Sequence, residues 1–138
     1  MTRIVVDASV AVKWFLPEDH SKEALRLLDE RRELLAPDLI WAEVGNVLWK
    51  RWRGGELAAE NARIILQDFR KLPLLIHPAD EIAEAAWSLA SELGRSFYDS
   101  LYLALAANQS CPMVTADRRL WNALGSTLAS LVWIEDFN

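Results

Sequence analysis

The chain has 138 residues, of which 52% are hydrophobic and 25% charged, and its formal net charge at pH 7 is −5. This length and composition are typical of one globular domain, expected to span residues 1–138, which can bury a core without disulfides or structural zinc. The acidic balance weighs against a nucleic-acid partner, because phosphate binders usually carry a basic surface. Two observations soften this argument: bound cations would cancel the charge of a carboxylate cluster, and basic residues are grouped at 50–53 and 118–119.

The start of the chain and its single cysteine argue against a secreted or membrane protein. Asp7 follows only three apolar residues, so no signal-peptide core is expected there. Charges interrupt every later apolar run, so no membrane span is expected either. Cys111 cannot form an internal disulfide, which fits a reducing compartment. We therefore expect a soluble cytoplasmic protein.

Strands and helices are predicted to alternate along the chain. Short β-branched or apolar runs predict buried strands, and apolar residues at 3.6-residue spacing predict amphipathic helices. In chain order, the pattern predicts a strand at 4–6, a helix at 8–15, a helix capped by Ser21, a strand at 34–36, helices at 38–52 and 58–71, a strand at 73–76, helices at 80–93 and about 97–110, a strand at 113–115, a helix at 117–124 and a strand at 131–134. This alternation predicts an α/β fold, a three-layer α/β/α sandwich around a mostly parallel five-stranded sheet.

Four acidic residues are expected to meet at one edge of this sheet. Asp7 directly follows the first strand, and Asp117 lies just past the fourth. Glu43 lies in the first turns of the helix after the second strand, and Asp99 lies in the first turn of the helix that leads toward the fourth. Ligands of open parallel sheets bind beyond the carboxyl ends of the strands, where the strand order reverses. All four carboxylates can therefore reach one rim.

A cluster of carboxylates favours a divalent cation. Like charges raise each other's pKa unless a cation compensates them, and Mg²⁺ or Mn²⁺ prefers oxygen ligands. Such an ion can lower the pKa of a bound water and stabilise charge on a phosphoryl group. Each acid alone has a plainer explanation, as a helix cap, a turn residue or a solvent-facing side chain. Capping does not require four acids at one rim, so we favour a functional site.

Several segments together resemble PIN-domain proteins, and among them the VapC-type toxins of bacterial and archaeal toxin–antitoxin pairs. They are VVDAS at residues 5–9, Glu43 a few residues after Pro37, YDSLYLALA at 98–106 and VTAD at 114–117. The resemblance covers nearly the whole chain. It departs from the family pattern at Ser100, where many members have Ala.

This resemblance implies a Mg²⁺- or Mn²⁺-dependent endoribonuclease, the toxin of a type II pair. The acidic site of the family maps onto Asp7, Glu43, Asp99 and Asp117. Ser9 and Thr115 match positions where a hydroxyl supports the site. The resemblance also implies a homodimer held in check by a cognate antitoxin whose C-terminal segment covers the acidic groove. Family members cleave structured RNA, and the target varies among them.

Other residues are candidates for contacts rather than for catalysis. Arg118 and Arg119 are the candidates for contact with RNA phosphate, although a solvated helix face has the same pattern. Three of the seven tryptophans, Trp41, Trp49 and Trp52, share one helix with basic residues. We favour packing of these tryptophans against the antitoxin or the second subunit over stacking on bases.

Alternatives remain at this point. A signalling receiver domain is also α/β and binds Mg²⁺, but it needs a second acid after the first strand, an Asp after the third and a Lys after the last. Here Ala8 follows Asp7, the third strand leads into His77, and the last leads into Glu135. Two further alternatives are a catalytically inactive PIN-like binding module, which the presence of all four acids disfavours, and a metal-dependent nuclease acting on DNA, which the same acids could serve. Contacts to the 2′-OH would separate RNA from DNA.

Overall fold

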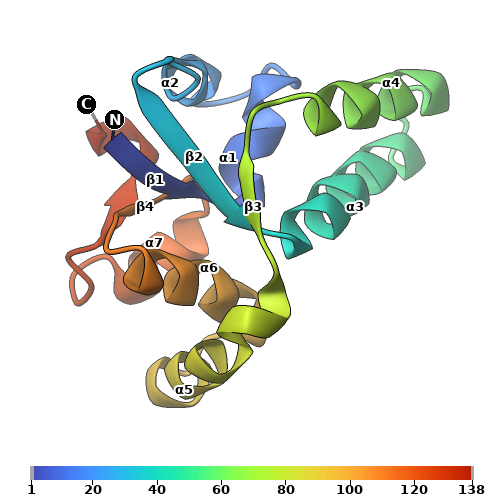
Figure 1. Ribbon diagram of the computed structural model, residues 1–138. Coiled ribbons are helices and arrows are strands. Elements are labelled where there is room, and N and C mark those ends of the chain that lie inside the picture. The colour runs from blue at the N-terminus through green and yellow to red at the C-terminus, as the bar shows by residue number, and fades with distance from the viewer. Residues whose placement is uncertain (1, 138) are drawn as a thin grey trace.

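The computed structural model describes residues 2–137, which form a five-stranded sheet in which every neighbouring pair of strands is parallel. The strands are β1 (Thr2–Val6), β2 (Arg32–Pro37), β3 (Leu75–His77), β4 (Met113–Thr115) and β5 (Leu131–Trp133). Their order across the sheet is β3-β2-β1-β4-β5 (Figure 1). The chain builds outward from β1 to β3, then returns to the other side of β1. The strand order therefore reverses between β1 and β4.

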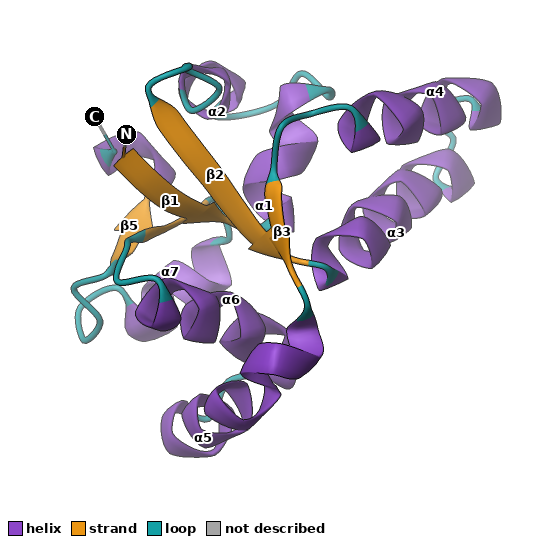
Figure 2. Cartoon of the chain, viewed as in Figure 1, coloured by secondary structure: helices purple, strands orange, loops and turns teal. Residues whose placement is uncertain are grey.

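Helices cover both faces of the sheet (Figure 2). They are α1 (Ala8–Ala11), α2 (Ser21–Arg26), α3 (Leu39–Arg53), α4 (Ala59–Arg70), α5 (Ala83–Leu93), α6 (Phe97–Asn108) and α7 (Arg118–Leu124), with 3₁₀ turns η1 (Val12–Trp14), η2 (Ala79–Ile82) and η3 (Ile134–Asp136). Right-handed crossovers place α1 to α4 on one face and α5 to α7 on the other. The predicted three-layer sandwich is confirmed, and its sheet is wholly parallel.

Helix α6 lies inside the protein rather than on its surface. It packs against β1, β2 and β4 on one side and against α5 on the other. Seven consecutive residues, 100–106, are buried, which explains why this helix is apolar all round. Its first turn emerges at the rim formed by the carboxyl ends of the strands. The burial of α6 thus fixes Asp99 at that rim.

Local differences from the predicted elements have local causes. The helix predicted at 8–15 is α-helical only to Ala11 and continues as η1, a tightening that is common at helix ends. Trp14 anchors this turn by donating its indole N–H to the carbonyl oxygen of Ala24 at 2.8 Å. The strand predicted at 73–76 begins at Leu75, because pairing with β2 starts only there. The helix predicted at 80–93 opens as η2. No helix between residues 2 and 137 has the length and hydropathy to cross a membrane.

Candidate active site

Asp7 is a buried carboxylate at the carboxyl end of β1. Its residue surface is only 7% exposed, and three donors surround the side chain. Oδ1 accepts hydrogen bonds from Ser9 Oγ at 2.5 Å and from the backbone N–H of Val10 at 3.2 Å, and Oδ2 accepts one from Thr115 Oγ1 at 2.5 Å. The bond from Val10 makes Asp7 the N-cap of α1. Asp7 is therefore both a helix cap and an anion fixed at the sheet edge.

The two hydroxyl groups are themselves oriented by the chain that follows β4. Ser9 Oγ accepts the backbone N–H of Ala116, and Thr115 Oγ1 accepts the backbone N–H of Asp117, both at 3.0 Å. Because each oxygen is engaged as an acceptor by an amide, its proton is directed at Asp7. This network ties the end of β1 to the end of β4, at the point where the strand order reverses.

Burial raises the pKa of Asp7 from 3.8 to about 6. Loss of hydration is the largest cause, because a low-dielectric surrounding disfavours the charged form. The hydrogen bonds from Ser9, Thr115 and Val10 oppose this effect, and the negative charge of Asp117 adds to it. The pKa of this carboxyl group therefore lies well above that of a free aspartate.

Glu43 lies on α3 and is held by a residue of α6. Tyr102, whose residue surface is 2% exposed, donates its hydroxyl to Glu43 Oε1 at 2.6 Å. Partial burial raises the pKa of Glu43; the bond from Tyr102 lowers it, and the charges of Asp99 and Asp117 raise it further. The phenol pKa of Tyr102 is raised by burial and by the neighbouring acids, so its proton stays on oxygen.

Asp117 and Asp99 complete the group. Asp117 caps α7, where its Oδ1 accepts the backbone N–H of Arg119 at 3.0 Å, and its charge raises the pKa of both Asp7 and Glu43. Asp99 lies in the first turn of α6 and pairs with Arg95, whose Nη2 is 3.2 Å from Asp99 Oδ2. Asp117 thus lies close enough to Asp7 and Glu43, and Asp99 close enough to Glu43, for their charges to raise those pKa values.

The donor set of this rim suits a hard divalent cation in its chemistry. It consists of carboxylate oxygens, and the pKa of Asp7 and of Glu43 is raised mainly by loss of hydration and further by repulsion from neighbouring acids, which Mg²⁺ or Mn²⁺ would offset. As they stand, however, no three side chains of His, Cys, Asp or Glu within residues 2–137 form a group that could hold a metal ion. The chemistry of the donors fits a hard cation, since Mg²⁺ is commonly held by one or two carboxylates together with water ligands.

Two residues of this site were not singled out from the sequence, Tyr102 and Arg95. Tyr102 lies three residues after Asp99, and residues at this spacing share one face of a helix. That periodicity could have placed it beside the acids, but its partner Glu43 is 59 positions away. Arg95 precedes Ser96, the N-cap of α6. An arginine four residues before an acid has many surface explanations, so no signal distinguished it.

The residues predicted to contact RNA or a partner protein differ in what their side chains contact. Arg118 and Arg119 are both exposed, and the guanidinium of Arg118 lies 4.0 Å from the ring centre of Trp133. Trp41 packs edge-on against Phe69 of α4, with 4.9 Å between the ring centres.

Trp49 and Trp52 remain 54% and 41% exposed. They border an apolar groove of about 310 Å³ between α3 and α4. Of the three tryptophans on this helix, these two are available to a partner.

Known proteins resemble this chain over most of its length. The family model for the PIN domain matches residues 4–124. Ribonuclease VapC3 of Pyrobaculum aerophilum is 35% identical over 120 residues, which cover 86% of this chain and 92% of that protein. Ribonuclease VapC1 of Mycobacterium tuberculosis is 36% identical over 129 residues, which cover 91% and 93%.

A solved toxin–antitoxin complex from Klebsiella pneumoniae contains a chain of similar fold. The TM-score is 0.64 with 16% identity, and the match covers 97% of this chain and 99% of that one. At this identity the likeness concerns the fold alone.

Proposed function

The chain belongs to the PIN domain family and is similar over most of its length to VapC ribonucleases, and we propose that it is a Mg²⁺- or Mn²⁺-dependent endoribonuclease, the toxin of a type II toxin–antitoxin pair. The observation that carries the proposal is Asp7, a buried carboxylate with a pKa near 6 and with other acids beside it. Burying a charge without a cation is costly. A buried carboxylate of this kind is therefore more readily explained by a functional role than by a structural one.

The residues of the rim would have different roles in metal binding. Asp7, Glu43, Asp99 and Asp117 would hold the cation. When bound, such an ion activates water as a nucleophile and neutralises charge on the phosphoryl group. Ser9 and Thr115 keep Asp7 ionised and in one orientation by donating to its two oxygens. Tyr102 holds Glu43 in place by donating its hydroxyl to Oε1.

RNA is the substrate that the ribonuclease relatives support. Arg119, exposed beside the N-cap of α7, is the better placed of the two candidate phosphate contacts, because Arg118 already stacks on Trp133. The acids alone do not separate RNA from DNA, since both present the same phosphodiester. An experiment has to make that distinction.

Incubating purified protein with total RNA and Mn²⁺ is expected to give discrete cleavage products with defined ends, mapped by sequencing. A single-stranded and a double-stranded DNA of matched length should remain intact under the same conditions. The Asp7→Asn protein, prepared in the same way, controls for contaminating nucleases. Cleavage of DNA in preference to RNA would support the DNA nuclease instead, and intact RNA and DNA would support the binding module.

The proposed partners are an antitoxin and a second copy of the chain. The antitoxin is supported by the toxin–antitoxin complex that shares this fold, and the exposed Trp49 and Trp52 are the surface that we assign to it. Aromatic side chains are enriched in the buried centres of protein interfaces.

Expressing the chain alone is expected to arrest bacterial growth, and co-expressing the small protein encoded by a neighbouring gene should restore it. Asp7→Asn is the matched control, because it should be tolerated without the neighbour. Colony counts and culture density measure the effect. Normal growth with folded wild-type protein present would contradict the toxin role while leaving the nuclease activity to be judged by the RNA digest.

A further inference from the structure

The cation nearest to the acidic rim is provided by the protein itself. Within residues 2–137, Arg95 is the one basic side chain at salt-bridge distance from any of the four acids, and it pairs with Asp99. Both side chains are about one quarter exposed, 25% for Arg95 and 28% for Asp99. This guanidinium therefore supplies positive charge at the rim, where we have proposed that a divalent cation binds.

Two arginine pairs of the molecule are held at two points, whereas Arg95–Asp99 is held at one, as are Arg3–Glu33 and Arg51–Glu18. Arg31 grips Asp29 with two hydrogen bonds, from Nε at 3.1 Å and from Nη2 at 2.8 Å, and Arg63 holds Glu60 through the same two atoms. Such two-point contacts are the strong form of the arginine–carboxylate pair. Arg95 makes a single contact, at 3.2 Å.

A second nitrogen of the Arg95 guanidinium shows that the contact leaves its hydrogen bonding incomplete. Its Nε is buried and has no hydrogen-bond partner among the described residues. A buried donor without an acceptor is unfavourable, so the guanidinium does not lie where its own hydrogen bonding would be best satisfied. A contact of this kind can be exchanged for another more easily than a two-point pair.

We infer that Arg95 is a positioning residue that acts as the counter-ion of Asp99 in the metal-free protein and gives up this carboxylate when a divalent cation binds. The inference rests on the proposed metal-dependent function. It identifies Arg95 as the side chain that competes with the divalent cation for the carboxylate of Asp99. It is consistent with the finding that no three His, Cys, Asp or Glu side chains within residues 2–137 form a group that could hold a metal. A guanidinium and a divalent cation repel each other, and both need the Asp99 oxygens.

Calorimetric titration with Mn²⁺ at low salt tests the inference without measuring activity. Arg95→Gln is expected to tighten Mn²⁺ binding by about three- to tenfold, because it removes a competing partly buried pair and a nearby positive charge. Arg95→Lys, which keeps the charge, should bind like the wild type. In the double variant Arg95→Gln/Asp99→Asn the gain should disappear, because the competition acts through Asp99.

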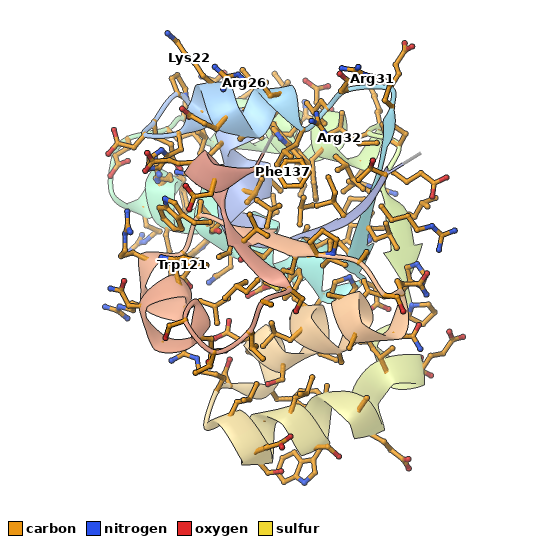
Figure 3. The ribbon with its side chains drawn as sticks, turned by 90° about the vertical axis from the view of Figure 1, so that its left-hand side faces the viewer. Lys22, Arg26, Arg31, Arg32, Trp121 and Phe137 are labelled. Carbon is orange, nitrogen blue, oxygen red and sulfur yellow. The ribbon has the colours of Figure 1, made fainter. Side chains whose placement is uncertain are left out.

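Arg31→Gln is the matched control, since it also breaks an Arg–Asp pair and removes one positive charge. Arg31 lies in the turn before β2, at the end of the molecule away from α5 and α6 (Figure 3), and its loss should leave Mn²⁺ affinity unchanged. Thermal melting adds a second readout. Arg95→Gln should melt below the wild type in chelator and level with it in saturating Mn²⁺, whereas a purely structural role would lower both values.

Unchanged or weaker Mn²⁺ binding by Arg95→Gln would overturn the inference and leave the proposed function standing. An equal gain in Mn²⁺ affinity for Arg31→Gln would also overturn the inference, because the gain would then come from the change in net charge and not from the loss of the Arg95–Asp99 pair. If the wild type itself takes up no Mn²⁺, the proposed metal dependence fails first, and the inference fails with it.

Discussion

Replacing Asp7 with Asn is expected to lower the rate of RNA cleavage by about a thousandfold or more while leaving the fold intact. The amide keeps the size of the carboxyl group, and its oxygen can still accept from Ser9 Oγ and from the N–H of Val10. Thr115 Oγ1 can turn from donor to acceptor toward the new NH₂ group. What is lost is the charge that the site needs, and single-turnover cleavage of a labelled RNA measures that loss.

The same substitution should stabilise the metal-free protein above pH 6. Because one pKa unit is worth about 1.4 kcal/mol, raising Asp7 from 3.8 to about 6 costs the ionised protein about 3 kcal/mol. The folded state holds the proton more tightly than the unfolded chain, so wild-type stability should rise as the pH falls from above 6 toward 4. The raised pKa of Glu43 acts in the same direction. Urea unfolding in chelator should show a flatter pH profile for Asp7→Asn.

An aspartate away from the rim provides the control for both effects. Asp68 lies on α4 with its side chain 52% exposed, so Asp68→Asn should change neither cleavage nor the pH profile of stability. Cleavage by Asp7→Asn within a few-fold of the wild type would remove Asp7 from the site. A variant that is inactive and also unfolded would show that Asp7 acts through stability, and far-UV circular dichroism distinguishes the two outcomes.

The sequence predicted the features that depend on local pattern. Asp7 and Asp117 could be placed because Asp7 directly follows one predicted strand and Asp117 lies just past another, and the carboxyl ends of parallel strands meet at one edge. The apolar stretch within 98–110 predicted a helix correctly, because no periodic polar face was needed once α6 was buried on all sides. These inferences needed only the residues within one element and the rules for joining elements.

Features that depend on contacts between distant elements could not be predicted in this way. The bond from Tyr102 to Glu43 joins two helices that approach only after the sheet has formed. The exposure of Trp49 and Trp52, against the packing of Trp41 on Phe69, depends on how α4 folds back on α3. Helical spacing groups the three tryptophans but does not decide which of them α4 covers.

Withdrawing divalent cations is expected to abolish cleavage, and adding Mg²⁺ or Mn²⁺ in excess of the chelator should restore it. The acids of the rim repel one another, so the metal-free protein should also be less stable than the loaded one. A cation at a hundredfold excess over its Kd stabilises the folded state by about 2.7 kcal/mol. Thermal melting with and without Mn²⁺ measures this gain, and the Asp7→Asn protein should lose most of it.

The pH dependence of this gain identifies the group that the cation meets. Since the pKa of Asp7 is about 6, an ion must displace a proton from this carboxyl below that pH, and its affinity should fall as the pH drops from 7 to 5. Titrations in buffers of different ionisation enthalpy count the protons released. Cleavage that persists in excess chelator would contradict the proposed mechanism. An affinity for Mn²⁺ that does not change across this range would place the ion away from Asp7, because binding at Asp7 has to displace its proton.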